Sequence, residues 1–262
     1  SNRSIINLVF RGCNLYGGFV FSTLLPMFDN NPNLKYMSVI KCMEKESVNM
    51  LAFVLTRFGT LKKFQYTDNG SGNMGEEKII KALASHSNLK DIDLSSNEIG
   101  FKGMEALAAL LENPNSILEC ISLEKSNLDD AKLCTLIDAL SYGNENSSLK
   151  KVELGGNPEI TSLAWKYLFS TIRYTKIETL TMWGNSLNDS ASKLLSNKVK
   201  SSRLKSLNLN RCRSITENGW CALFGAAKST DCTLEVLHLC NNGFDDNSII
   251  SLTSSLIVNS TL

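Results

Sequence analysis

A short apolar pattern recurs along the whole chain at nearly constant spacing. Its clearest copy has Leu89, Ile92, Leu94, Asn97 and Ile99 in the arrangement L-x-x-L-x-L-x-x-N-x-L. Further copies begin at residues 5, 34, 61, 118, 149, 177, 204 and 234, and the last residue, 262, occupies the first position of another. The steps between copies are 27–31 residues. A period that persists through the chain predicts stacked structural units that share one continuous core.

Each repeat combines a strand with a helix. The L-x-x-L-x-L half alternates as a short strand does. In the second half, residues such as Met104, Leu107 and Leu111 recur at helical spacing, and similar patterns cover 48–55, 76–83, 163–172 and 249–258. Strands that alternate with helices indicate a parallel sheet. The predicted fold class is α/β: a solenoid (horseshoe) of about nine repeats over residues 1–262, with an inner parallel sheet and outer helices.

The asparagine of the pattern follows the strand, where the chain turns. We expect its amide to satisfy backbone groups that leave the sheet. Cysteine replaces it at Cys13, Cys42 and Cys212, and Ser126 replaces it once. These cysteines therefore have a structural explanation.

Long repeats with a full helix after each strand resemble the ribonuclease-inhibitor-like class of leucine-rich repeat proteins. That class includes ribonuclease inhibitor, the Ran GTPase-activating protein and the C-terminal regions of NOD-like receptors. Two repeats carry one extra residue before Ile160 and Ile215 and resemble the cysteine-containing repeats of F-box ubiquitin-ligase adaptors. The resemblance implies protein–protein recognition, with regulation of a small GTPase or substrate capture for a ubiquitin ligase as alternatives. Solenoids usually carry polar caps at their terminal repeats. Neither end of this sequence has one, so we expect a fragment that lacks both caps.

Composition argues against several other classes of function. Hydrophobic residues make up 43% and charged residues 20%, with a formal net charge of +1. This balance predicts no general affinity for nucleic acid or acidic membranes. No apolar run reaches the roughly 18 residues needed to span a membrane, and no signal peptide is recognisable. Eight cysteines without a C-x-x-C pair favour reduced thiols and a cytoplasmic or otherwise intracellular location.

No pattern supports catalysis, a cofactor, a metal or a small-molecule substrate. Gly70, Gly72 and Gly75 spell G-x-G-x-x-G. However, the strand before them is half polar, whereas a nucleotide-binding strand should be almost wholly apolar. A glycine-rich turn is therefore expected. The two histidines, His86 and His238, lack the partners of a catalytic base or a zinc site, so we expect this chain not to be an enzyme.

The concave strand face is the predicted binding surface for a protein partner, because alternation points the variable strand positions toward it. We expect this face to be acidic in its middle and basic toward its C-terminal end, an asymmetry that can orient a partner. Around the basic end, the segment from Ala191 to Thr216 contains no acidic residue. The candidate contacts are Asp91, Asp93, Glu124, Lys205, Asn208, Asn210, Arg211 and His238.

Trp183 is the sharpest single candidate. Leu180 and Met182 fill core positions, which leaves Trp183 on the concave side. The flanking glycines, Gly155, Gly156 and Gly184, are expected to leave its ring uncovered, and an exposed tryptophan beside Arg211 suits a binding hot spot. The alternative is a ring that lies flat on its neighbours. We expect Trp165 and Trp220, in helical halves, to be structural, and Tyr36 to face the concave side.

Overall fold

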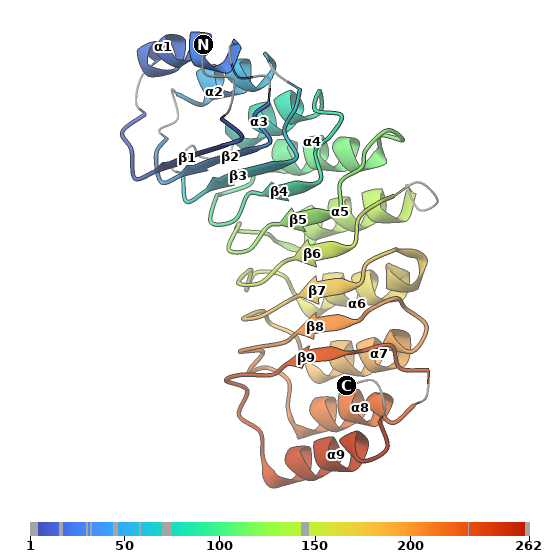
Figure 1. Cartoon of the computed structure of the whole chain (residues 1–262). Helices are drawn as coiled ribbons and strands as arrows, with labels where there is room; N and C mark the ends of the chain where they lie inside the picture. The colour runs from blue at the N-terminus through green and yellow to red at the C-terminus, as the bar shows by residue number, and fades with distance from the viewer. Residues whose placement is uncertain are drawn as a thin grey trace. The chain divides into compact units, whose positions relative to one another are not determined.

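The computed structural model describes residues 5–15, 18–29, 31, 33–43, 47–57, 59–69, 75–142, 147–229 and 231–259. It divides into two compact units. The N-terminal unit comprises residues 1–127 and 145–149, and the C-terminal unit comprises residues 128–144 and 150–262. Both units repeat a strand followed by a helix (Figure 1), which confirms the predicted α/β repeat fold. Residues 70–74 of the glycine-rich segment and Leu262 lie outside the described residues.

The strands of the N-terminal unit are parallel and pair in chain order. Its elements are β1 (Asn7–Arg11), α1 (Gly18–Asp29), β2 (Tyr36–Ile40), α2 (Val48–Leu55), β3 (Lys63–Thr67), α3 (Gly75–Leu83), β4 (Asp91–Asp93), α4 (Phe101–Glu112) and β5 (Cys120–Ser122).

The C-terminal unit continues the alternation, and its strands are also parallel and pair in order. Its elements are α5 (Asp130–Tyr142), β6 (Lys151–Glu153), α6 (Ser162–Thr171), a 3-10 turn η1 (Ile172–Tyr174), β7 (Thr179–Thr181), α7 (Asp189–Val199), β8 (Ser206–Asn208), α8 (Glu217–Ala227), β9 (Val236–His238) and α9 (Asp246–Leu256).

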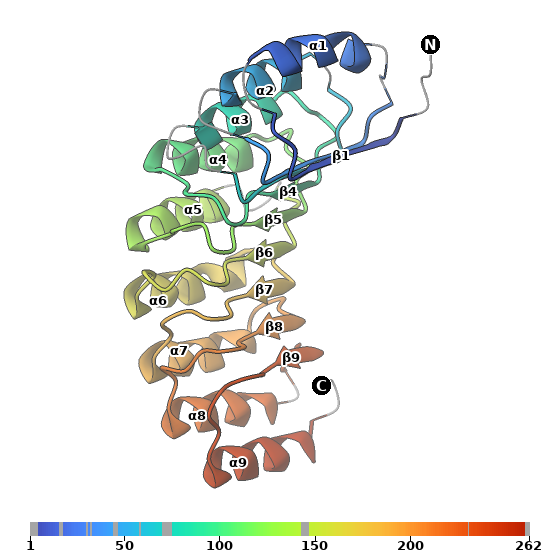
Figure 2. The same cartoon turned by 90° about the vertical axis from the view of Figure 1, so that its left-hand side faces the viewer.

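The helices of each unit cover one face of its strands and leave the other face open (Figure 2). We call the uncovered side the open face. In β4, Ile92 is fully buried toward the helices, while Asp91 and Asp93 are half-buried on the open face. Burial of one such isoleucine or leucine side chain stabilises by about 1.5–3 kcal/mol. The apolar row that defines the repeat is therefore the core.

The asparagine of the pattern bonds backbone groups that follow the strand, as expected, and these bonds also join neighbouring repeats. The Oδ1 atom of Asn97 accepts the backbone N–H of Asn69 at 3.0 Å, and that of Asn185 accepts the N–H of Asn157 at 2.8 Å. The Asn185 Nδ2 group also donates to the carbonyl of Leu154 in the preceding repeat. We call this place in each repeat the ladder position. Its occupants are Cys13, Cys42, Asn69, Asn97, Ser126, Asn157, Asn185, Cys212 and Asn242.

Cysteine and serine at the ladder position act as neutral donors. Cys42 Sγ donates to the carbonyl of Ile40 at 2.9 Å, and Cys212 Sγ to that of Met182 at 3.4 Å. Burial raises the pKa of Cys212 to about 11, so its thiol keeps the proton that it donates. Ser126 Oγ donates to Leu94 O in the same manner. The structural explanation of Cys42, Cys212 and Ser126 is confirmed.

The residue before each ladder position has a positive φ. Glycine occupies this place in three repeats, with φ between 61° and 72°. Side chains that rarely adopt the left-handed region occupy others, including Lys41 at φ 53° and Arg211 at φ 57°. The turn out of the strand therefore imposes this conformation whatever the residue.

One further expectation about the apolar residues holds in the structure. Trp165 and Trp220 are buried, with 0% and 2% of their surface exposed, so both belong to the core. Within the described ranges, no helix is both long and apolar enough to cross a membrane.

Candidate recognition surface

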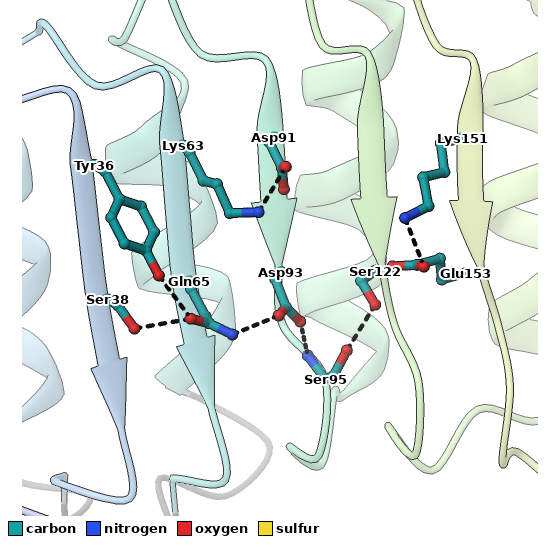
Figure 3. Close-up of polar contacts among 10 residues, drawn as sticks. All are labelled: Tyr36, Ser38, Lys63, Gln65, Asp91, Asp93, Ser95, Ser122, Lys151 and Glu153. Carbon is teal, nitrogen blue, oxygen red and sulfur yellow. Dashed lines mark hydrogen bonds and ion pairs between the residues drawn. The ribbon is translucent and has the colours of Figure 1, made fainter. Parts of the chain in front are cut away.

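The open face of the N-terminal unit carries side chains that bind one another (Figure 3). Gln65 on β3 is central: its Oε1 accepts from Tyr36 Oη at 3.0 Å and from Ser38 Oγ at 2.9 Å. Its Nε2 donates to Asp93 Oδ2 at 2.8 Å. The other oxygen of Asp93 accepts the backbone N–H of Ser95 at 3.0 Å. Tyr36 thus lies on this face as expected, with its hydroxyl already bound.

An ion pair accompanies this network on the same face. Lys63 Nζ lies 2.9 Å from Asp91 Oδ2 on the next strand. Partial burial acts to lower the pKa of Lys63, but the hydrogen bond and charge of Asp91 outweigh it, and the pKa is raised. Glu124 follows β5 and is half-buried. The acidic region expected here therefore contains Lys63 as its own counter-ion, which reduces its net charge.

Trp183 follows β7 in the C-terminal unit, and its ring lies against Gly155. A Cβ atom on Gly155 would fall 2.2 Å from Trp183 Nε1, so only glycine fits beneath the indole. Trp183 is half-buried and Gly155 is buried. The expectation that Gly155 leaves the ring uncovered is wrong, because the ring folds back onto the preceding repeat. The alternative, a ring lying flat on its neighbours, describes it better.

Asn208 and Asn210 lie beside this ring's strand, on and after β8. The Oδ1 of Asn208 accepts the backbone N–H of Asn210 at 3.0 Å, and that of Asn210 accepts the N–H of Cys240 at 2.6 Å. Neither Nδ2 group has an acceptor among the residues that the structure describes. Both side chains are held by their oxygens and present amide donors on the open face.

His238 on β9 pairs in register with Asn208 and is exposed. On β6, Lys151 Nζ and Glu153 Oε1 form an ion pair of 2.8 Å (Figure 3). Across the four strands of the C-terminal open face, Glu153 of this ion pair is therefore followed by Thr181, Asn208 and His238.

The basic residues near β8 fall at its two opposite ends. Lys205 precedes the strand and pairs with Glu178 Oε2 at 3.2 Å. Arg211 follows the strand, is exposed, and its guanidinium has no partner within the described part of the chain. Arg213 lies beyond it, whereas Lys198, Lys200 and Arg203 lie at the first end with Lys205. The single basic region expected from the sequence is therefore divided by β8.

The other histidine, His86, belongs to the core of the N-terminal unit. His86 is buried, and its Nε2 lies 2.8 Å from Leu55 O. Burial lowers its pKa. In the described ranges, no three His, Cys, Asp or Glu side chains gather closely enough to hold a metal ion.

Sequence reasoning missed the residues that bind the candidates. Ser38, Gln65, Ser95, Ser122 and Lys151 were not singled out. A signal existed, because Lys63 and Gln65 lie 28 residues before Asp91 and Asp93, which is one repeat period. Adding the local repeat spacing, which is 27–30 residues between paired strands, to an open-face strand position gives its partner on the next strand.

Comparison with known proteins agrees with this geometry. A family model described as "Leucine Rich repeat" matches residues 85–108, which contain β4 and the start of α4. This match falls on the repeat whose ladder residue, Asn97, accepts from the preceding ladder residue, Asn69, and donates to Leu94 O in its own repeat. The chain is built of leucine-rich repeats.

Several curated relatives of this leucine-rich repeat chain share one naming pattern. It is 30% identical over 194 residues to NACHT, LRR and PYD domains-containing protein 12 of Mus musculus, covering 71% of this chain and 18% of that protein. It is 25% identical over 283 residues to protein 5 of the same series from Mus musculus, covering 96% and 24%. The chain thus spans about a fifth of the length of these relatives.

One solved structure supports the fold alone. The structure titled "Leiomodin-1 Actin-Binding Site 2 (ABS2)" superposes with a TM-score of 0.50 at 15% sequence identity. The match covers 58% of this chain and 86% of that one.

Proposed function

We propose that this leucine-rich repeat chain is a recognition module that binds a protein partner on the open face of its C-terminal unit. Binding rests on shape and hydrogen bonding on a rigid scaffold, and no bond is made or broken. The contacts are Trp183, Asn208, Asn210, Arg211 and His238.

The observation that carries the proposal is the pairing of a supported aromatic ring with unused donors. Trp183 lies against Gly155, so its orientation is set before a partner arrives. The Nδ2 groups of Asn208 and Asn210 stand on the neighbouring repeat with their oxygens already bound. Preorganised aromatic and amide groups lose little conformational entropy on binding.

The open face of the N-terminal unit is the weaker candidate. A partner that contacts Asp91 or Asp93 has to compete with Lys63 and Gln65. Exchange of one hydrogen bond for another yields little net free energy. Asp91, Asp93 and Glu124 therefore serve as secondary contacts, and Lys205, paired with Glu178, sets orientation more than affinity.

The relatives' names fit a module of this kind within a longer protein. Each name includes LRR beside NACHT and PYD domains, and we propose that this chain supplies the partner-binding repeat part of such a protein, inside the cell. Regulation of a small GTPase and capture of ubiquitin-ligase substrates stay hypotheses.

Affinity capture from native cell extract tests the proposal. The intact chain is compared with a Trp183→Ala, Arg211→Glu variant. The matched control is Arg173→Glu, Tyr174→Ala, which removes an exposed arginine–aromatic pair elsewhere in the same unit, at η1. Partners lost by the first variant and kept by the control support the proposal. Equal retention or equal loss in both variants contradicts it.

Fluorescence quenching by acrylamide then locates each captured partner. Trp165 and Trp220 are buried, so Trp183 is the tryptophan that a quencher reaches. A partner on the open face shields Trp183 and reduces quenching. A partner that binds without changing the quenching lies elsewhere and overturns the assignment of the surface.

A further inference from the structure

Cys13 and Cys42 occupy the ladder position in the first two repeats. Arg11 on β1 and Ile40 on β2 are partners in the parallel register, and Cys13 and Cys42 each lie two residues after one of them. The backbone N–H of Cys13 donates to Cys42 Sγ at 3.2 Å. The N–H of Gly12 donates to Ile40 O at 2.9 Å. The parallel pairing of β1 and β2 thus continues to the two cysteines and makes them direct neighbours.

The two thiols have the same orientation. Cys13 Sγ donates to Arg11 O at 3.5 Å, and Cys42 Sγ donates to Ile40 O at 2.9 Å. Neighbouring strands lie about 4.8 Å apart, which places the two Cα atoms within the roughly 4.4–6.8 Å span of disulfides. Parallel Cα–Cβ bonds keep the Cβ atoms slightly beyond the relaxed disulfide separation. A bond between them needs a small shift and is readily reduced.

Strand β1 is able to make that shift. Its inward side chains Leu8 and Phe10 are only half-buried, whereas Met37 and Val39 on β2 are 0% exposed. Fewer packing contacts resist a displacement of β1 than of the inner strands.

The two sulfurs also differ in access. Cys13 is exposed, while Cys42 is 1% exposed. A reagent from solution therefore reaches Cys13 first, and Cys42 is shielded from direct attack but lies against its neighbour.

We propose that Cys13 and Cys42 form a reversible disulfide by exchange with a low-molecular-weight disulfide of the glutathione type. Cys13 loses its proton to solvent, and its thiolate attacks the small disulfide to form a mixed disulfide. One glutathione thiolate is released and takes up a proton. The Cys42 sulfur then attacks Cys13 Sγ and displaces the second glutathione as a thiolate, which takes up the Cys42 proton. Two protein thiols are oxidised, and one glutathione disulfide is reduced to two thiols.

The environment of Cys42 suits the resolving role. Burial raises the pKa of Cys42, so the thiol stays protonated and unreactive toward outside reagents. It reacts when the mixed disulfide forms beside it, because proximity replaces high nucleophilicity.

The chain provides a matched control in Cys212. It occupies the ladder position of its repeat and is buried. The ladder residues of the two adjacent repeats are asparagines, and Asn242 Oδ1 accepts the N–H of Cys212 at 2.7 Å. Serine serves the ladder position at Ser126, so serine variants of the cysteines are expected to fold.

The test is incubation of the folded chain with oxidised glutathione, followed by tryptic mapping without reduction. Cleavage gives one peptide of residues 12–35 and one of residues 42–45, which the disulfide joins. The joined peptide is expected in the intact chain and in Cys212→Ser. Because the folded structure holds the thiols together, it should form at least about tenfold faster than in guanidinium chloride. Millimolar reduced glutathione should reverse it.

The single variants separate the two roles. In Cys42→Ser, Cys13 is expected to stop at the glutathione adduct. In Cys13→Ser, Cys42 is expected to stay a free thiol. A stable glutathione adduct on Cys13 in the intact chain, with Cys42 free, overturns the proposal. So does a joined peptide that forms no faster in the folded chain than in denaturant, or no joined peptide at all.

Discussion

Asp189 holds Thr216 through both of its carboxylate oxygens. Oδ1 accepts the backbone N–H of Thr216 at 2.7 Å, and Oδ2 accepts its hydroxyl at 2.6 Å. Asp130 holds Thr161 in the same way, at 2.6 and 2.5 Å. Thr161 and Thr216 are the N-caps of α6 and α8, and both end the turns that carry one extra residue. Asp130 and Asp189, the first residues of α5 and α7, thus hold the longer turns that lead into α6 and α8.

Removal of this clamp should loosen the longer turn. Asp189→Ala is expected to lower the free energy of unfolding by about 1–2 kcal/mol, because two charge-assisted hydrogen bonds are lost at a partly exposed site. Urea titration followed by circular dichroism measures the loss. Asp231→Ala, which replaces an exposed aspartate without a side-chain bond among the described residues, should change stability by less than about 0.5 kcal/mol. Equal effects of both variants would show that the clamp does not stabilise.

Two glycines of α8 should respond to alanine with opposite signs. A Cβ atom on Gly219 would lie 2.6 Å from both Asp189 Oδ1 and Ile215 Cγ2. Gly219→Ala is therefore expected to destabilise by about 1–3 kcal/mol. Gly225 has nothing within 4 Å of its added Cβ, so Gly225→Ala should stabilise by up to about 1 kcal/mol. Thermal unfolding of both variants measures the two signs, and a stabilising Gly219→Ala contradicts the close approach.

Substitution at a ladder position should depend on the donor that remains. Asn185→Ala removes the side-chain acceptor of the buried N–H of Asn157. It also removes one of the two donors to the carbonyls of Leu154 and Met182, which keep Asn157 Nδ2 and Cys212 Sγ as donors. Each buried group left without a partner costs about 1–3 kcal/mol. Asn185→Cys should lose less, because Cys212 shows that a thiol still donates to a carbonyl from this position. Denaturant unfolding ranks the two variants, and an equal loss would mean that the donor contributes nothing.

The turn before the ladder position should favour glycine. Ser96 has φ 58° and Gly184 has φ 67°. Ser96→Gly is expected to stabilise by about 0.5–1 kcal/mol, since glycine adopts this conformation without steric cost. Gly184→Ala should destabilise by about 1–2 kcal/mol for the converse reason. Melting temperatures of the pair decide, and shifts in the same direction contradict the assigned strain.

The stability of the N-terminal unit should fall in mild acid because of His86. Burial lowers its folded-state pKa below 6.5, against the opposing hydrogen bond to Leu55 O. As pH falls, the unfolded chain takes up the proton first. The stabilisation is complete above about pH 6.5 and is lost as pH falls toward the folded pKa.

Urea midpoints measured at several pH values between 5 and 7.5 test this dependence. His86→Gln should flatten the profile. A profile that His86→Gln does not alter assigns the pH dependence to other groups.

The period and the alternation of strand and helix were predictable because the spacing of apolar residues can be seen within each continuous segment of the sequence. The role of Asn97 and Asn185 followed from their place after the strand. The contact of Trp183 with Gly155 did not, since the ring turns toward a residue 28 positions earlier. The division of the basic segment was missed because adjacency in the chain conceals that β8 separates Lys205 from Arg211. The left-handed backbone of Lys41 was also not predictable, because lysine rarely adopts this conformation.

The bonds at the ladder position bear on how repeats can be added to or removed from such a chain. Asn69, Asn185 and Asn242 each place an amide oxygen on the preceding repeat's backbone and an amide N–H on its carbonyl. The surface that a repeat offers to its successor is therefore chemically the same at every one of these junctions. Duplication or excision in register of a repeat that has asparagine at its ladder position would therefore recreate the same bonds at the new join.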